Sequence, residues 1–139
     1  MKLAKKKSFD DWIEVEEGIS FLIDYPTVEQ NRELQKFTIK NANALTELAE
    51  GSEDTANYWS GFEYMSLYLK YTIKDWKENV DGKDHKGMFA DDELYSCELK
   101  DGALTDELLH MLTGDIEQTT NLFNIIYSEL EVTEGDQQK

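Results

Sequence analysis

The segment from Thr55 to Trp76 predicts a helix that is apolar on two sides. With 3.6 residues per turn, one side collects six apolar residues, Tyr58, Phe62, Met65, Leu69, Ile73 and Trp76. The opposite side collects Tyr64, Leu67 and Tyr71, with Tyr68 between the two sides. A helix on the surface of a domain ordinarily has one apolar stripe. This helix is therefore either sandwiched in the core or offers its second side to a partner, and the greater frequency of core packing favours the sandwich.

The chain before this helix predicts a β-hairpin followed by a long helix. Residues 12–15 and 19–25 read as two strands joined by Glu16-Glu17-Gly18, and alternate residues of the second strand share one face. Residues 27–30 have the form of a capping box, which begins a helix. The apolar stripe of that helix comprises Leu34, Phe37, Leu45 and Leu48. Asn41 interrupts the stripe, where it either forms a local hydrogen bond, as we expect, or fixes the register against a partner helix.

The chain after residue 76 is rich in turns and ends in two helices. Asp81-Gly82 and Asp101-Gly102 are turn signals, and residues 94–99 between them read as the strand that pairs with the N-terminal hairpin. A short helix follows at residues 105–112, and Gly114 ends it. The last helix has an apolar stripe made of Ile116, Phe123, Ile126, Tyr127 and Leu130.

The whole chain reads as a single domain. Its 139 residues lie within the usual length of one domain. The predicted fold class is α+β, with a small antiparallel sheet, built from the hairpin and one later strand, against which about four helices pack. Residues 1–8 and 132–139 read as flexible tails.

The charge of the chain is strongly negative. It has 30 acidic and 14 basic residues, a net charge of −16, and from Met88 to Gln138 there are 13 acidic residues and a single base, Lys100. Such a charge repels nucleic-acid phosphates and anionic lipids, so we expect neither nucleic acid nor membrane as a direct partner. The common explanation is a solvated, highly soluble surface. The alternatives are an acidic face that docks a basic partner, or one that imitates nucleic acid.

The location predicted from the sequence is the cytoplasm. Cys97 is the single cysteine, which excludes an intrachain disulfide and fits a reducing compartment. No apolar run has the length of a membrane span. The basic start of the chain leads into Ser8-Phe9-Asp10-Asp11 rather than into an apolar region, so it does not read as a signal peptide.

The residues suited to catalysis or metal binding are few. His85 and His110 have no second His or Cys at metal-ligand spacing. Residues 79–82 invite comparison with a calcium loop, but the ends of that loop would be Lys77 and Met88, where anionic oxygens are required. No phosphate-binding glycine loop or nucleophile elbow is present. We therefore predict no metal, no cofactor and no enzymatic activity, with a catalytic site assembled from distant residues as the open alternative.

Short motifs in two parts of the chain carry a resemblance to a family. Residues 71–76, Tyr-Thr-Ile-Lys-Asp-Trp, followed by Val80-Asp81-Gly82, resemble a pattern of small tailed-bacteriophage proteins, the tail assembly chaperones among them. The turn at residues 24–27 before the first long helix is similar to theirs as well. Those proteins often have glycine soon after the tryptophan, whereas this chain has Lys77-Glu78-Asn79.

The resemblance implies a non-enzymatic protein in the cytoplasm of the host cell. Such a protein keeps an aggregation-prone tail component, such as the tape-measure protein, soluble during assembly. The surface expected to bind that helical component is the second side of the two-sided helix, with Tyr64, Leu67, Tyr68 and Tyr71. The alternative function is that of an acidic mimic of nucleic acid, which inhibits a basic DNA-binding protein through the acidic stretch that begins at Met88.

Overall fold

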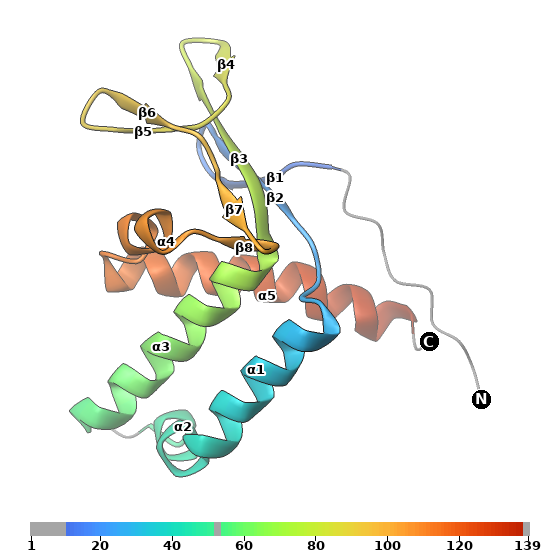
Figure 1. The fold of residues 1–139 in the computed structure, drawn as a ribbon, viewed down its shortest axis with the longest axis vertical. Coiled ribbons are helices and arrows are strands. Elements are labelled where there is room, and N and C mark those ends of the chain that lie inside the picture. The colour runs from blue at the N-terminus through green and yellow to red at the C-terminus, as the bar shows by residue number, and fades with distance from the viewer. Residues whose placement is uncertain (1–10, 52–53, 138–139) are drawn as a thin grey trace.

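The computed structural model describes residues 11–137 except 52 and 53, and the fold is α+β, as predicted (Figure 1). A four-stranded antiparallel sheet has the strand order β1-β2-β3-β4. Its strands are β1 (Ile13–Glu16), β2 (Ile19–Ile23), β3 (Ile73–Val80) and β4 (Lys83–His85). Two small hairpins follow it in the chain, β5 (Met88–Ala90) with β6 (Glu93–Tyr95), and β7 (Leu99–Lys100) with β8 (Ala103–Leu104).

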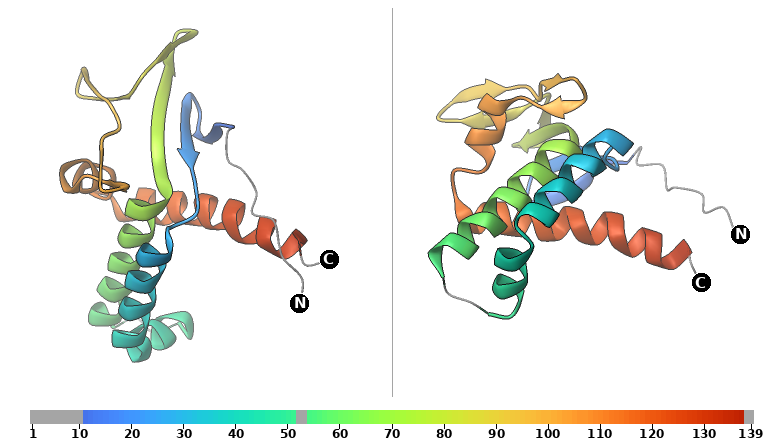
Figure 2. Two further views of the ribbon diagram at one scale, coloured as in Figure 1. Left: turned by 45° about the vertical axis from the view of Figure 1, so that its right-hand side comes forward. Right: turned by 60° about the horizontal axis from the view of Figure 1, so that its bottom comes forward.

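The helices of the described part of the chain gather at one end of the molecule. They are α1 (Val28–Lys40), α2 (Ala42–Ala49), α3 (Thr55–Thr72), α4 (Asp106–Leu112) and α5 (Ile116–Gln137). The long helix α5 crosses the base of the strands, while β3 and β4 extend away from the helices (Figure 2).

The predicted N-terminal hairpin is confirmed, because β1 and β2 pair antiparallel. Gly18 at its turn has a φ of +82°, a backbone conformation that residues other than glycine rarely adopt. A Cβ atom there would lie 3.0 Å from the carbonyl oxygen of Asn79. The backbone N–H of Asn79 donates to the carbonyl oxygen of Gly18 at 2.7 Å. Glycine therefore lets β3 approach the turn closely.

The third strand of this sheet is β3, and the prediction that residues 94–99 pair with the hairpin is wrong. Those residues are divided between the two small hairpins, with β6 bound to β5 and β7 bound to β8. The division follows from an unrecognised turn at Asp91-Asp92, where both residues have positive φ, 48° and 71°. Two residues with positive φ between paired strands form a tight hairpin. Pairing partners that are so near in sequence leave residues 94–99 unavailable to the larger sheet.

Helix α3 ends at Thr72 and β3 begins at the next residue, so the predicted helix of residues 55–76 is too long. Ile73 and Trp76 are buried as predicted, but they lie on a strand. The register of β2 and β3 shifts between the pairs Leu22–Asp75 and Ile23–Ile73. That irregularity places Ile73 and Trp76 on one face of the strand although they are three positions apart. Residues three apart also share a face of a helix, so the spacing alone could not distinguish the two structures.

The predicted capping box begins α1: the Thr27 hydroxyl accepts from the Gln30 backbone N–H at 3.2 Å, and Gln30 Oε1 accepts from the Thr27 N–H at 2.9 Å. The long helix predicted after it is divided into α1 and α2 at Asn41. Asn41 Nδ2 donates to the carbonyl oxygen of Phe37 at 2.9 Å, so the expected local hydrogen bond is confirmed.

At the other end of the chain, α5 extends to Gln137 and takes in most of the predicted tail 132–139. The predicted tail 1–8 lies outside the described residues.

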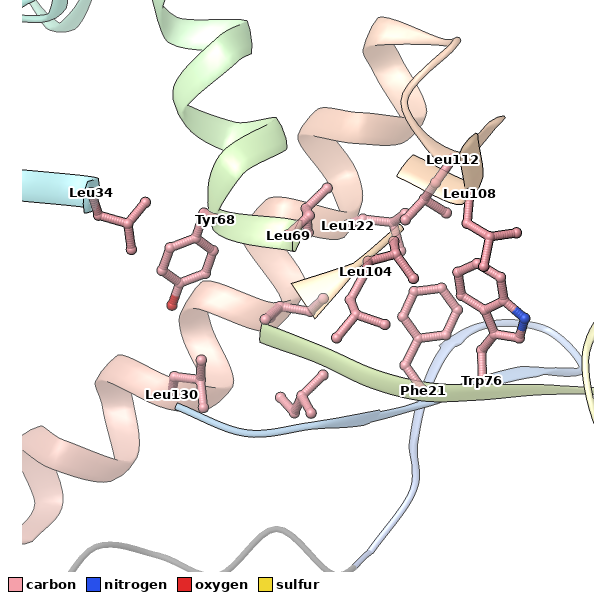
Figure 3. Packing of buried hydrophobic residues seen from close by; sticks show 13 residues of the cluster. Phe21, Leu34, Tyr68, Leu69, Trp76, Leu104, Leu108, Leu112, Leu122 and Leu130 are labelled. Atoms are coloured by element: carbon pink, nitrogen blue, oxygen red, sulfur yellow. The ribbon is translucent and has the colours of Figure 1, made fainter. Parts of the chain in front are cut away.

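The core lies between α3, α5 and the sheet, and α3 is sandwiched, as favoured by the sequence. It packs against α5 on one side and against α1 and α2 on the other. Leu69 of α3, Ile73 of β3 and Ile126 of α5 have no exposed surface. Phe21 of β2 and Trp76 of β3 lie side by side and face Leu104 and Leu108 (Figure 3).

Candidate protein-binding groove

The four residues predicted to bind a partner do not form one exposed surface. Tyr68 is buried, and Tyr64, Leu67 and Tyr71 are partly buried against the core. Leu67 lines a hollow beside α4, whereas Tyr71 lines another between α1 and the β7–β8 hairpin. Packing between helices therefore covers much of the predicted surface.

The rings of Tyr64 and Tyr68 belong to an internal cluster that joins three helices. The Tyr64 ring lies 6.1 Å from Phe37 of α1 and 6.2 Å from Phe123 of α5. The Tyr68 ring lies 5.1 Å from Phe123 and 5.9 Å from Tyr127. Burial, and then the neighbouring Tyr127 and Glu131, raise the pKa of the Tyr64 hydroxyl. These rings fix α3 between α1 and α5.

A different surface is hollowed and apolar. Two adjoining hollows, of about 340 and 230 Å³, lie between the face of the main sheet and helices α4 and α5. Both are lined by Ile19, Met88, Leu112 and Gln118, and together we call them the sheet–helix groove.

Local sequence patterns supply the walls of the sheet–helix groove. Ile19 and Phe21 point to the same side of β2, because side chains alternate along a strand. On α5, Gln118, Leu122 and Ile125 recur at intervals of four and three residues and so share one face. A helix face and a strand face are thus set opposite each other.

Several polar groups within the groove are hydrogen-bonded inside the protein. Trp76 Nε1 donates to the carbonyl oxygen of Tyr95 at 2.8 Å, which holds β6 beside β3. Gln118 Nε2 donates to the carbonyl oxygen of Leu112 at 2.9 Å. The Phe89 N–H donates to Glu78 Oε1 at 3.0 Å. These bonds leave mainly apolar side chains to contact a ligand.

Two large apolar side chains at the α4 end of the groove are open to solvent. Phe89 of β5 is 38% exposed and Met111 of α4 is 41% exposed. Exposed apolar side chains beside a hollow mark a binding surface when they occur together rather than singly. The rings of His85 and Phe89 contact each other edge to face, with their centres 5.0 Å apart.

The charged residues that line the groove are all acidic. They are Glu16 of β1, Glu78 of β3, and Asp115 and Glu117 at the start of α5. The groove therefore combines an apolar floor with a negative rim.

A further hollow, of about 740 Å³, has a different character. It lies between α1, α3 and the β7–β8 hairpin, and acidic and basic side chains line it in equal number. Lys36 pairs with Glu33 at 3.3 Å, and Lys70 pairs with Asp106 at 3.2 Å. Opposite charges in equal number, two pairs of which form ion pairs, give this hollow no net preference for a ligand of either sign.

The Cys97 thiol is not activated for nucleophilic attack. Burial, and then the carboxylates of Asp75 and Glu98, raise the pKa of the Cys97 thiol to about 12. The thiol is therefore protonated at neutral pH and is a poor nucleophile. Among the side chains that the structure describes, no three from His, Cys, Asp or Glu come together in a group that could hold a metal ion.

Comparisons with known proteins return no match: no protein-family model, no curated protein and no solved structure resembles the chain significantly. Among the helices that the structure describes, none combines the length and the apolar character needed to cross a membrane.

Proposed function

We propose that the protein is a non-enzymatic assembly protein of the phage tail assembly chaperone type, which binds a helical tail component such as a tape-measure protein. The observation that carries this proposal is the sheet–helix groove, with Phe89 and Met111 exposed beside its apolar floor. In place of the tyrosine side of α3, we assign the binding of the partner to this groove.

The size of the groove specifies what enters it. A helix with its side chains is about 10–12 Å across, so hollows of about 340 and 230 Å³ accept individual side chains of a partner rather than a whole helix. Amphipathic helices bind grooves in this way, through apolar side chains one turn apart. Two adjoining hollows suit two such side chains.

The negative charge of the chain supports a role in keeping a complex soluble. A net charge of −16 makes copies of the protein repel one another. A partner that exposes apolar surface aggregates through that surface. A strongly charged protein bound over it covers the apolar surface and adds repulsion between the complexes.

The test is co-expression with the tape-measure protein of the same phage. We expect the soluble fraction of the tape-measure protein to rise when this chain is present, and the variant Phe89→Ala/Met111→Ala to lose most of that rise. The control is Val28→Ala/Ile39→Ala, which removes two apolar side chains that are 71% and 77% exposed on α1, away from the groove. The proposal is wrong if the soluble fraction does not rise, or if the control loses the rise as well.

A further inference from the structure

We propose that the segment bound in the sheet–helix groove is basic, with lysine or arginine side chains flanking the apolar side chains that enter the hollows. This inference rests on the proposed function, since it specifies the chemistry of the partner at the same groove. The argument is charge complementarity: an apolar floor with an acidic rim fits apolar side chains beside cationic ones.

The rim has negative charge that the protein itself does not neutralise. Glu78 and Asp115 each accept a hydrogen bond from a backbone N–H, of Phe89 and of Gln118 respectively. Within the described part of the chain, the carboxylates of Glu16 and Glu117 take part in neither a hydrogen bond nor an ion pair. These two carboxylates are therefore available to a partner.

The lysine next to Trp76 on β3 lies on the other face of the sheet from the groove. Lys77 follows Trp76 on β3, but it lines a hollow with Glu14 and Ser20 on the opposite face of the sheet. Its Nζ lies 3.6 Å from Asp84 Oδ2 and 4.7 Å from the centre of the Trp12 ring. This cation does not offset the charge of Glu16 or Glu117.

A partner of the wrong charge is disfavoured at this rim. Like charges brought together at an interface weaken binding, whereas complementary charges speed association and select the partner. The net charge of −16 also repels an acidic partner from the rest of the surface. An acidic segment with the same apolar side chains should therefore bind far more weakly.

The experiment measures fluorescence anisotropy with two labelled synthetic amphipathic peptides and the full chain. The peptides share leucines at the same positions and differ only in having lysine or glutamate elsewhere. We expect the lysine peptide to bind more than roughly tenfold tighter than the glutamate peptide at low salt. Its affinity should fall steeply toward 1 M salt, where the screening length is about 3 Å.

A charge-matched pair of variants tests the rim itself. Glu16→Gln/Glu117→Gln should raise the Kd of the lysine peptide by roughly threefold to tenfold at low salt, in line with exposed ion pairs. Glu14→Gln/Glu98→Gln removes the same charge outside the groove and should change the Kd little. Circular dichroism of both variants checks that the fold is retained.

The outcomes separate this inference from the proposed function. Equal affinity for the two peptides overturns the inference and leaves the proposed function standing, as does an equal effect of the two charge variants, which would reveal general attraction to an acidic protein. If neither peptide binds, the inference falls, and the co-expression experiment then decides the proposed function independently.

Discussion

Trp76→Phe removes the hydrogen bond that links β3 to β6. One wall of the sheet–helix groove depends on this link. Trp76 is 3% exposed, its ring lies 5.8 Å from Phe21, and its Nε1–H donates to the carbonyl oxygen of Tyr95 at 2.8 Å. Phenylalanine keeps an aromatic ring but removes the donor. The carbonyl of Tyr95 then loses its partner, at a cost of about 1–3 kcal/mol. The smaller ring adds about 1 kcal/mol for the unfilled space.

The sum is a loss of about 2–4 kcal/mol in the free energy of unfolding. With an m-value of about 2 kcal/mol/M, the urea midpoint should fall by about 1–2 M, measured by circular dichroism. Trp59→Phe is the matched control, because Trp59 is 48% exposed and an exposed substitution changes stability by less than about 0.5 kcal/mol. Equal midpoints for the two variants would refute the reasoning, since the buried N–H would then contribute nothing.

Two further predictions concern the core and the thiol. Leu69→Ala should lower the free energy of unfolding by about 2–5 kcal/mol, because Leu69 has no exposed surface, while Ile39→Ala on the exposed side of α1 should leave it almost unchanged in the same urea titration. Cys97 has its pKa raised from an ordinary 9.0 to about 12, so the folded state holds a proton that the unfolded state releases, and stability should fall as the pH rises from about 9 to 12. Cys97→Ser should flatten that decline in urea titrations repeated across this pH range, and an unchanged pH profile would show that the thiol does not cause it.

The sequence was informative where a local pattern has a single structural meaning. The capping box at Thr27 and Gln30 needs no tertiary context, and the hairpin around Gly18 follows from strand alternation and a turn. The Asp-Gly pairs at 81–82 and 101–102 both form turns with positive φ. The presence of apolar residues on two sides of α3 correctly indicated a sandwiched helix.

The sequence was misleading where one spacing fits two structures. Ile73 and Trp76 continue the helical period of α3 and also share a face of a strand whose pairing is irregular. The hydrogen bond from the Asp24 N–H to the carbonyl oxygen of Thr72, at 3.0 Å, attaches the end of the helix to the chain after β2. Such a contact depends on a segment far away in the sequence, so no local window contains it.

The groove could not be predicted from the sequence, because its walls come from segments that meet only after folding. Ile19, Trp76, Met88, Met111 and Leu122 belong to five different elements. The available signal was weak: Met88 and Phe89 are apolar residues in an otherwise acidic, turn-rich segment. Tyr64 and Tyr68 of α3 were more conspicuous, but their rings pack against Phe123 and Phe37 inside the fold.

The pairing of β2 with β3 has a consequence for the order in which the chain folds. Ile23 pairs with Ile73, so the two central strands of the sheet are separated in sequence by all of α1, α2 and α3. A two-stranded hairpin by itself is marginally stable in water, and closing a long loop costs entropy before the pairing is gained. During synthesis, therefore, β2 can pair with β3 only after β3 has left the ribosome. Helices α1, α2 and α3, which precede β3 in the chain and make more local contacts, can form before that pairing.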